Sequence, residues 1–151
     1  MKEFIKITDK NDILRYLHDF SEVFPHLCEK IESMEEYAAK LSEFSNFYIA
    51  SYDGLHLGLA VFYSNDQQSK NAYISLIGLK EAARNKGLGS WLLKKCEDAS
   101  VKDGMTKMSL EVDCDNPTAI TFYKQNGYKE GELTQRNSMY MHKILGEDCY
   151  D

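Results

Sequence analysis

The chain has 151 residues, of which two are proline, and a net charge of −6 at pH 7. This length is enough for one domain with a core of its own, and no Gly/Ser-rich or Pro-rich stretch offers a linker. We therefore expect a single domain over residues 1–151. The acidic balance argues against binding to nucleic acid or to an anionic membrane surface.

The N-terminal segment is too short and too charged for a signal peptide. No apolar run approaches the roughly 20 residues that a membrane span needs. These features predict a cytoplasmic protein.

The N-terminal third of the chain predicts one strand and two helices. Residues 4–8 predict a short strand, and either Asp9 or Asn11 is expected to cap the helix that follows. A second helical stretch is predicted after Pro25. Apolar residues recur at helical spacing in both, at Ile13, Leu14, Leu17 and Phe20 and at Leu27, Ile31, Met34, Ala38 and Leu41.

The middle of the chain changes to a strand period. Residues 47–50 and 57–63 predict two strands joined by a hairpin turn at Asp53-Gly54. After a polar turn, residues 72–79 form a nearly all-apolar run, which suits a strand covered on both faces.

The remaining residues predict helices and strands in alternation. A helix is expected from Leu88 to about Asp103, followed by a strand at 108–113, a short helix at 118–125 after Pro117, and strands at 128–133 and 138–145. The order of elements predicts a mixed α/β fold in which an antiparallel meander leads into a βαβ unit.

The loop Arg84-Asn85-Lys86-Gly87-Leu88-Gly89 joins the strand ending at Leu79 to the next helix. Its two glycines let the backbone come close to a ligand. The N–H groups of the first helical turn have no partners within the helix, and the helix dipole favours negative charge there. Arg84 and Lys86 add positive charge. The loop therefore predicts an anion site with room for a pyrophosphate.

Other phosphate-binding motifs fit this loop less well. The P-loop pattern GxxxxGK[ST] is absent, and a dinucleotide fingerprint would place glycine directly after the strand and a small residue at Leu92. The loop on its own is equally compatible with a glycine-rich helix entry that carries two surface cations.

A second motif follows one helix and one strand later: Asn116-x-x-Ala119-x-x-Phe122-Tyr123-x-x-x-Gly127-Tyr128. Together with the RxxGxG loop upstream, it resembles the Gcn5-related N-acetyltransferase (GNAT) superfamily. The resemblance covers residues 73–128 by motif and the rest of the chain by the order of elements.

The resemblance implies an acyl-CoA acyltransferase fold, with a mixed sheet of six or seven strands, about four helices, and a fourth and fifth strand that splay apart. The acyl-pantetheine arm would lie between these strands and hydrogen-bond the backbone of the fourth as an added strand does. Asn116 would contact the pantetheine, and Tyr123 would donate a proton to the leaving thiolate. The expected cofactor-binding residues are Ile77, Gly78, Leu79, Arg84, Asn85, Lys86, Gly87, Leu88, Gly89, Ser90, Asn116 and Tyr123.

Transfer of an acetyl group to an amine requires a neutral nitrogen. Deprotonation at pH 7 costs roughly 4.6 kcal/mol for a lysine-like amine and about 1 kcal/mol for an α-amine. A general base therefore matters most for a lysine-like acceptor. Glu111 lies five residues before Asn116, where the ribosomal-protein alanine N-acetyltransferases of this superfamily carry a glutamate cast as base. Strand alternation sends Glu111 and Asp113 to one face.

Other arrangements for the base stay open at this point. Asp113 and Asp115 are weaker candidates, because acidic residues are common at strand-to-helix turns. Tyr73 and Ser75 could hold a water that relays the proton, and Glu111 could be a solvated carboxylate. Backbone N–H groups near Ile77 or Leu79 would meet the oxyanion.

The remaining polar residues do not predict a metal site. Cys28, Cys96, Cys114 and Cys149 form no CxxC pair, and His18, His26, His56 and His142 fall outside both motifs. Cys96 lies on the apolar stripe of a helix and suits the core, and Cys114 is interpreted as a bystander.

The resemblance thus implies an acetyl-CoA-dependent N-acetyltransferase with Tyr123 as general acid and Glu111, or an ordered water, as general base. The acceptor is a small-molecule or peptide amine that the sequence does not identify. Alternatives are another acyl group, an acceptor hydroxyl, or a non-catalytic acyl-CoA-binding scaffold of the same fold. A homodimer is compatible with the resemblance.

Overall fold

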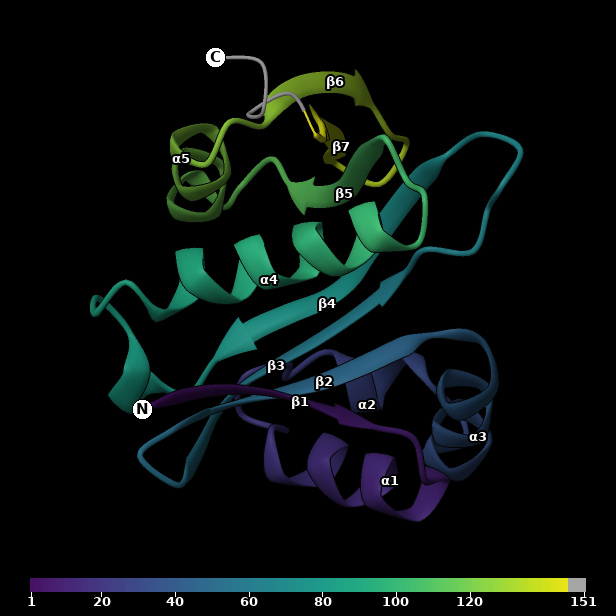
Figure 1. The fold of residues 1–151 in the computed structure, drawn as a ribbon, viewed down its shortest axis with the longest axis vertical. Coiled ribbons are helices and arrows are strands. Elements are labelled where there is room, and N and C mark those ends of the chain that lie inside the picture. Colours follow the sequence, from purple (N-terminus) through teal and green to yellow (C-terminus); the bar gives the residue numbers. More distant parts are fainter. Residues whose placement is uncertain (147–151) are drawn as a thin grey trace. The chain divides into compact units, whose positions relative to one another are not determined.

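A computed structural model describes residues 1–146, except for the side chain of Cys28, so that Cys149 lies outside the described residues. The fold is mixed α/β, as predicted (Figure 1). Its elements are β1 (Lys2–Ile7), α1 (Lys10–Asp19), α2 (Leu27–Lys30), α3 (Met34–Phe44), β2 (Asn46–Tyr52), β3 (Leu55–Tyr63), β4 (Asn71–Leu79), the 3-10 helix η1 (Glu81–Ala83), α4 (Leu88–Lys102), β5 (Lys107–Asp113), α5 (Pro117–Gln125), β6 (Lys129–Leu133) and β7 (Ser138–Ile144).

The strands form a seven-stranded sheet in the order β1-β2-β3-β4-β5-β7-β6. β4 and β5 are parallel, and β1 pairs with β2, β2 with β3, β5 with β7 and β6 with β7 in antiparallel fashion. A parallel pair needs a crossover connection, which α4 supplies. The mixed sheet of six or seven strands is confirmed.

The pairing of β4 with β5 runs from Asn71 opposite Lys107 to Ile74 opposite Leu110. The opening of the two strands beyond this point stays a prediction.

The chain divides into two compact units. The first contains Met1–Phe62 and Leu76–Cys96, and the second contains Tyr63–Ser75 and the chain from Glu97 onward. The single domain expected for residues 1–151 stays a prediction, and each unit is described by itself below.

Alternation along β1, β2 and β3 separates two faces in the first unit. On one face the ring of Phe4 stacks on Tyr48 at 3.8 Å between centroids, and Trp91 of α4 meets Phe4 edge-on at 6.4 Å. Gly58 lies on the same face opposite Ala50, and a Cβ there would come within 3.2 Å of Leu92. This face is therefore packed against α4.

The opposite face of the same strands is covered by α1 and α3, which lie side by side (Figure 1). The fully buried side chains of this layer are Ile13, Leu17, Phe20, Leu41, Phe47, Ile49, Leu59 and Val61. The odd-numbered residues Phe47, Ile49, Leu59 and Val61 thus supply the part of the core beneath α1 and α3, as a strand period of two requires.

The predicted helix after Pro25 is wrong as one continuous element. The structure ends α2 at Lys30, places Ile31 in an extended conformation, and begins α3 at Met34. The side-chain oxygen of Ser33 accepts a hydrogen bond from the backbone N–H of Glu36 at 3.2 Å. This is the Ser-x-x-Glu signal of a helix start, which lies within a segment whose apolar residues keep helical spacing on both sides of it.

At the first helix, Asp9 rather than Asn11 is the N-cap. Its carboxylate accepts from the backbone N–H groups of Asn11 and Asp12 at 2.8 and 3.0 Å. The sequence left both candidates open, and Asp9 satisfies two donors that the helix itself cannot pair.

The second unit also divides its strands into two faces. Leu110 and Val112 of β5 are buried together with Met139 and Met141 of β7. Glu111, paired in register with Tyr140, lies on the other face. The predicted alternation of β5 is therefore confirmed.

A buried ion pair holds α4 to β7 inside the second unit. Both Lys143 Nζ and the Tyr128 hydroxyl donate hydrogen bonds of 2.9 Å to the Glu97 carboxylate. Glu97 and Tyr128 are buried. The pairing offsets the cost of removing the carboxylate from water.

None of the helices in residues 1–146 is both long enough and apolar enough to cross a membrane.

Replacing Ser33 by Ala is expected to destabilise the protein by about 1 kcal/mol, because the first turn of α3 loses the acceptor for one of its N–H groups. Chemical denaturation measures the change, and Ser33→Thr, which keeps a hydroxyl, is the control. Equal stability of the Ala variant and the native protein would show that Ser33 does not set the start of α3.

Candidate functional site

The loop before α4 turns through two residues with positive φ. Arg84 follows η1, and Asn85 and Gly87 have φ of 64° and 77°. The backbone N–H of Trp91 donates to the carbonyl of Gly87 at 3.2 Å, which makes Gly87 the residue from which α4 starts. The sequence motif therefore coincides with a sharp turn into a helix N-terminus, as predicted.

This loop combines an accessible backbone with a fixed helix start. A Cβ added to Gly87 would meet no atom within 4 Å, and Arg84, Lys86 and Ser90 are exposed. Leu88, in contrast, is buried. Leu88 anchors the helix through its side chain, so the contribution predicted for it at an anion site is limited to its backbone N–H.

The end of β4 is packed on both sides. A Cβ added to Gly78 would come within 2.5 Å of Val23 and 3.0 Å of Phe24, so this glycine permits the close approach of the segment after α1. The side chain of Leu79 lies against Gly58 of β3. The side chain of Leu79 thus serves packing, and the cofactor contacts predicted for Ile77, Gly78 and Leu79 stay predictions that involve their backbone.

Asn116 has a structural role in addition to its predicted one. Its side-chain oxygen caps α5 by accepting from the backbone N–H of Ala119 at 3.2 Å, and Pro117 occupies the first turn. The capping bond uses the amide oxygen. The amide nitrogen is the donor that Asn116 can offer to a pantetheine carbonyl.

Tyr123 lies in an aromatic cluster on the second unit. Its ring meets Phe122 and Tyr128 edge-on, with centroids 5.3 and 5.8 Å apart, and its side chain is partly exposed. Tyr128 is itself fixed through its hydrogen bond to Glu97. Aromatic packing and the predicted catalytic role are compatible, because packing fixes the direction of the ring.

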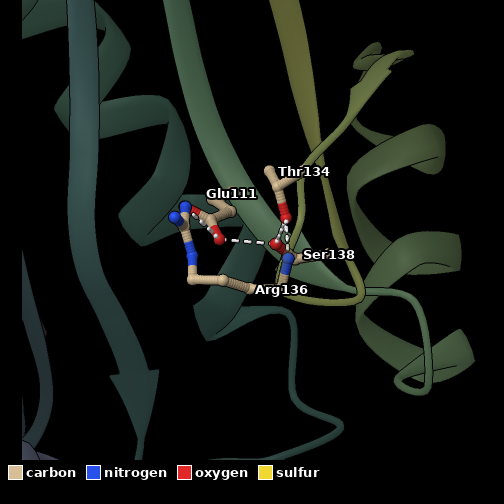
Figure 2. Close-up of polar contacts among 4 residues, drawn as sticks. All are labelled: Glu111, Thr134, Arg136 and Ser138. Carbon is tan, nitrogen blue, oxygen red and sulfur yellow. Dashed lines mark hydrogen bonds and ion pairs between the residues drawn. The ribbon is translucent and has the colours of Figure 1, made fainter.

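Glu111 is held by Arg136, on the turn between β6 and β7, and by Ser138, the first residue of β7 (Figure 2). Arg136 Nη2 donates to its two oxygens at 2.9 and 3.1 Å, and the Ser138 hydroxyl donates to Oε2 at 2.5 Å. The predicted base is therefore a paired carboxylate. The arginine favours its ionised form, but also competes with any proton donor for its lone pairs.

The turn that carries Arg136 is itself fixed. The hydroxyls of Thr134 and Ser138 lie 2.5 Å apart, and the backbone N–H of Arg136 donates to Thr134 Oγ1 at 3.1 Å (Figure 2). Asn137 donates to the carboxylate of Asp115 at 2.7 Å. Asp115, a weaker candidate for the base, is thus engaged in tying the turn to the end of β5.

Arg136 and Ser138 were not predicted. They lie 25 and 27 residues beyond Glu111, and their proximity depends on the register between β5 and β7. Glu111 pairs with Tyr140 in that register, so Ser138 is its diagonal neighbour on the same face. The alternation within 138–145 could have placed Ser138 and Tyr140 on one face, but not opposite Glu111.

Tyr73 of β4 belongs to the same electrostatic environment. Burial raises its pKa, the charges of Glu111 and Tyr140 raise it further, and Arg136 opposes them. Tyr73 therefore stays a neutral hydroxyl at physiological pH, able to donate a hydrogen bond to a water or a ligand.

Two of the four histidines have polar partners within the first unit. His56 Nδ1 lies 3.2 Å from the Tyr16 hydroxyl, and His26 pairs with Glu29. Cys96 is buried in α4, as predicted for a core residue. Among residues 1–146, no group of three or more His, Cys, Asp or Glu side chains could hold a metal ion.

The model of the acetyltransferase (GNAT) family matches residues 12–128, which include both motifs. The chain belongs to the GNAT family. Within this GNAT chain the matched segment extends from the start of α1 to Tyr128, so it contains the loop before α4, Glu111, Asn116 and Tyr123.

A sequence relative is the uncharacterized N-acetyltransferase YdgE of Bacillus subtilis (strain 168). It is 29% identical over 99 residues, and the alignment spans 63% of this chain and 63% of the relative.

Similar solved structures cover nearly the whole chain. The ribosomal-protein-S18-alanine N-acetyltransferase of Escherichia coli has a TM-score of 0.76 at 20% identity, covering 98% of both chains. A point mutant of the spermidine N-acetyltransferase SpeG from Vibrio cholerae has a TM-score of 0.76 at 17% identity, covering 97% of this chain and 95% of the SpeG chain. A GNAT acetyltransferase from Elizabethkingia anophelis, with acetyl-CoA bound, has a TM-score of 0.70 at 15% identity, covering 95% of this chain and 98% of that relative. These likenesses establish the GNAT fold.

Replacing Arg136 by Gln is expected to raise the pKa of Tyr73, because the substitution removes a positive charge that favours the phenolate. An NMR titration with labelled tyrosine measures it, and Tyr73→Phe assigns the resonance. A pKa that falls, or stays unchanged, would mean that Arg136 does not act on Tyr73.

Proposed function

We propose that this protein transfers the acetyl group of acetyl-CoA to a primary amine. The observation that carries the proposal is the loop before α4, where positive φ at Asn85 and Gly87 opens a helix N-terminus flanked by exposed Arg84 and Lys86 within the matched GNAT segment. The acetyl-CoA bound to the Elizabethkingia anophelis relative supports the choice of donor.

The loop before α4 takes the pyrophosphate in this proposal. Anions bind at helix N-termini because the N–H groups there lack partners and the helix dipole favours negative charge. Residues 85–90 supply these N–H groups, and the two cations add attraction. The backbone of Ile77, Gly78 and Leu79 and the amide of Asn116 hold the pantetheine arm.

The reaction is a direct attack of the amine on the thioester. The ammonium loses two protons overall: one leaves through Glu111, or an ordered water, to solvent, and the other ends on the thiol of coenzyme A through Tyr123. The carbon–nitrogen bond forms as the carbon–sulfur bond breaks. Proton transfers of this kind contribute about 10²–10⁴-fold to rate.

The pairing of Glu111 bears on how the first proton leaves. Because Arg136 and Ser138 occupy its oxygens, Glu111 accepts a proton directly when one of these two donors moves away. Otherwise it accepts the proton through a water. Tyr73 and Ser75, two residues apart on β4, supply the hydroxyls that hold such a water in this proposal. The Tyr73 hydroxyl stays protonated because burial raises its pKa.

The acceptor is a primary amine. Relatives of this fold are named for acetylating spermidine and the alanine of ribosomal protein S18. The net charge of −6 favours a cationic acceptor. The cytoplasmic location and the homodimer stay predictions.

Coenzyme A at 100 times its Kd is expected to stabilise the native protein by about 2.7 kcal/mol. Gly87→Ala should remove most of this gain, because a side chain is strained at positive φ and would stand in the anion site. Thermal unfolding with and without coenzyme A measures both.

Gly54→Ala is the matched control, since Gly54 has φ of 83° and equally open space for a Cβ but lies in the turn between β2 and β3. Both variants should lose stability, roughly 1–2 kcal/mol from the left-handed backbone. The stabilisation by coenzyme A should survive in Gly54→Ala. No stabilisation of the native protein at millimolar coenzyme A would refute the binding proposal.

Tyr123→Phe is expected to lower kcat about 100-fold or more, because the leaving thiolate loses its proton donor. Release of free thiol from acetyl-CoA with a panel of primary amines measures kcat, and the coenzyme A shift should be unchanged. Turnover equal to that of the native protein would remove Tyr123 from the acid role. If no amine releases thiol although coenzyme A binds, the chain is an acyl-CoA-binding scaffold.

A further inference from the structure

The ion pair between Glu111 and Arg136 joins a largely buried carboxylate to an exposed guanidinium. The side chain of Glu111 is 25% exposed and that of Arg136 is 66% exposed. A single guanidinium nitrogen contacts both carboxylate oxygens. Because Arg136 is exposed, its guanidinium is readily solvated when it leaves Glu111, and the cost of separation falls on the less exposed carboxylate.

Ser138 holds the same carboxylate in a different way. Ser138 is 1% exposed, it donates to Glu111 Oε2, and it is linked to Thr134 across the base of the turn (Figure 2). A buried residue within β7 cannot swing away as a long side chain on a turn can. The carboxylate therefore keeps its position when Arg136 leaves.

The surface around Glu111 suits a second cation. Tyr140 is the register partner of Glu111 on β7, and Tyr73 is two register positions away through Ser109. All of them share the face of the sheet opposite the buried Leu110 and Val112. A carboxylate flanked by tyrosine rings attracts an ammonium group through charge and through the ring faces.

We propose that a cationic acceptor binds by displacing Arg136 from Glu111. The guanidinium of Arg136 occupies the position on Glu111 that the ammonium group of the acceptor takes. The inference rests on the proposed function in taking the acceptor to be an amine. Exchange of one cation for another never leaves Glu111 unpaired, which avoids the cost of a buried uncompensated charge.

This exchange defines the class of acceptor. A compact primary ammonium on a flexible, cationic chain, as in a polyamine or a lysine side chain, can replace the guanidinium. An amine that carries a carboxylate next to its nitrogen would meet Glu111 with like charge and be rejected.

The test is equilibrium binding, with coenzyme A in place of acetyl-CoA so that no turnover occurs. Spermidine, cadaverine and lysine amide are titrated by calorimetry into the native protein and into Arg136→Gln. The variant should bind these cations about two- to fivefold tighter, the range set by the loss of an exposed competing ion pair.

Arg15→Gln is the matched control, because Arg15 is also an exposed arginine (63%) paired with an acid, Asp12, at 3.1 Å. It changes the net charge equally and should leave the affinities unchanged. In a Glu111→Gln background, the effect of Arg136→Gln should disappear, as in a double-mutant cycle of two coupled residues.

Several results would overturn the proposal. These are weaker binding to Arg136→Gln, an equal gain in Arg15→Gln, an undiminished gain without Glu111, or no binding of any of the three cations to Arg136→Gln at millimolar concentration. Failure of acetyl transfer with the exchange intact would instead count against the proposed function, since the titration does not use the reaction.

A measurement on the native protein covers the case in which a variant does not fold. The side-chain Nε–H resonance of Arg136, assigned with Arg136→Lys, should move toward the position of a solvated guanidinium as spermidine saturates the protein. A resonance that does not move while spermidine binds would contradict displacement.

Discussion

The two-residue period of β5 makes a core and a polar site from the same strand. Leu110 and Val112 are buried with the methionines of β7, and this burial fixes the register between the two strands. Once the register is fixed, Ser138 has to lie beside Glu111 on the opposite face. A slip by one residue would turn Glu111 into the core and expose Leu110, so the same hydrophobic burial that stabilises the unit also positions its carboxylate.

The loop before α4 depends on the core in a similar way. Its backbone is open, yet its end is fixed, because Leu88 is buried and Leu79 packs against Gly58. An anion site formed by backbone N–H groups is useful only if these groups keep their direction without the ligand. Burial on both sides of an exposed, strained turn provides that preorganisation, and the positive φ of Gly87 turns the chain into the helix.

Local signals in the sequence predicted the features that a few neighbouring residues determine. The cap of α1, which the sequence narrowed to Asp9 or Asn11, the glycine turn before α4 and the alternation of β5 each depend on contacts among neighbouring residues. The prediction of a single helix after Pro25 is wrong because the apolar residues keep helical spacing across the break, while the cap at Ser33 starts a new helix. Arg136 escaped prediction for another reason. Its proximity to Glu111 follows from strand pairing over 25 residues, which no local pattern encodes.

Two of the ion pairs in the second unit, Glu97 with Lys143 and Glu111 with Arg136, differ in how exposed their cations are. Glu97 is 4% exposed and pairs with Lys143, which is 25% exposed, so neither charge can leave without stranding the other away from water. Such a pair is costly to break and suits a permanent contact. Glu111 pairs with Arg136, which is 66% exposed and can be solvated at once. A carboxylate that is fixed by a buried hydroxyl but neutralised by an exposed cation can exchange its counter-ion while the fold around it stays unchanged.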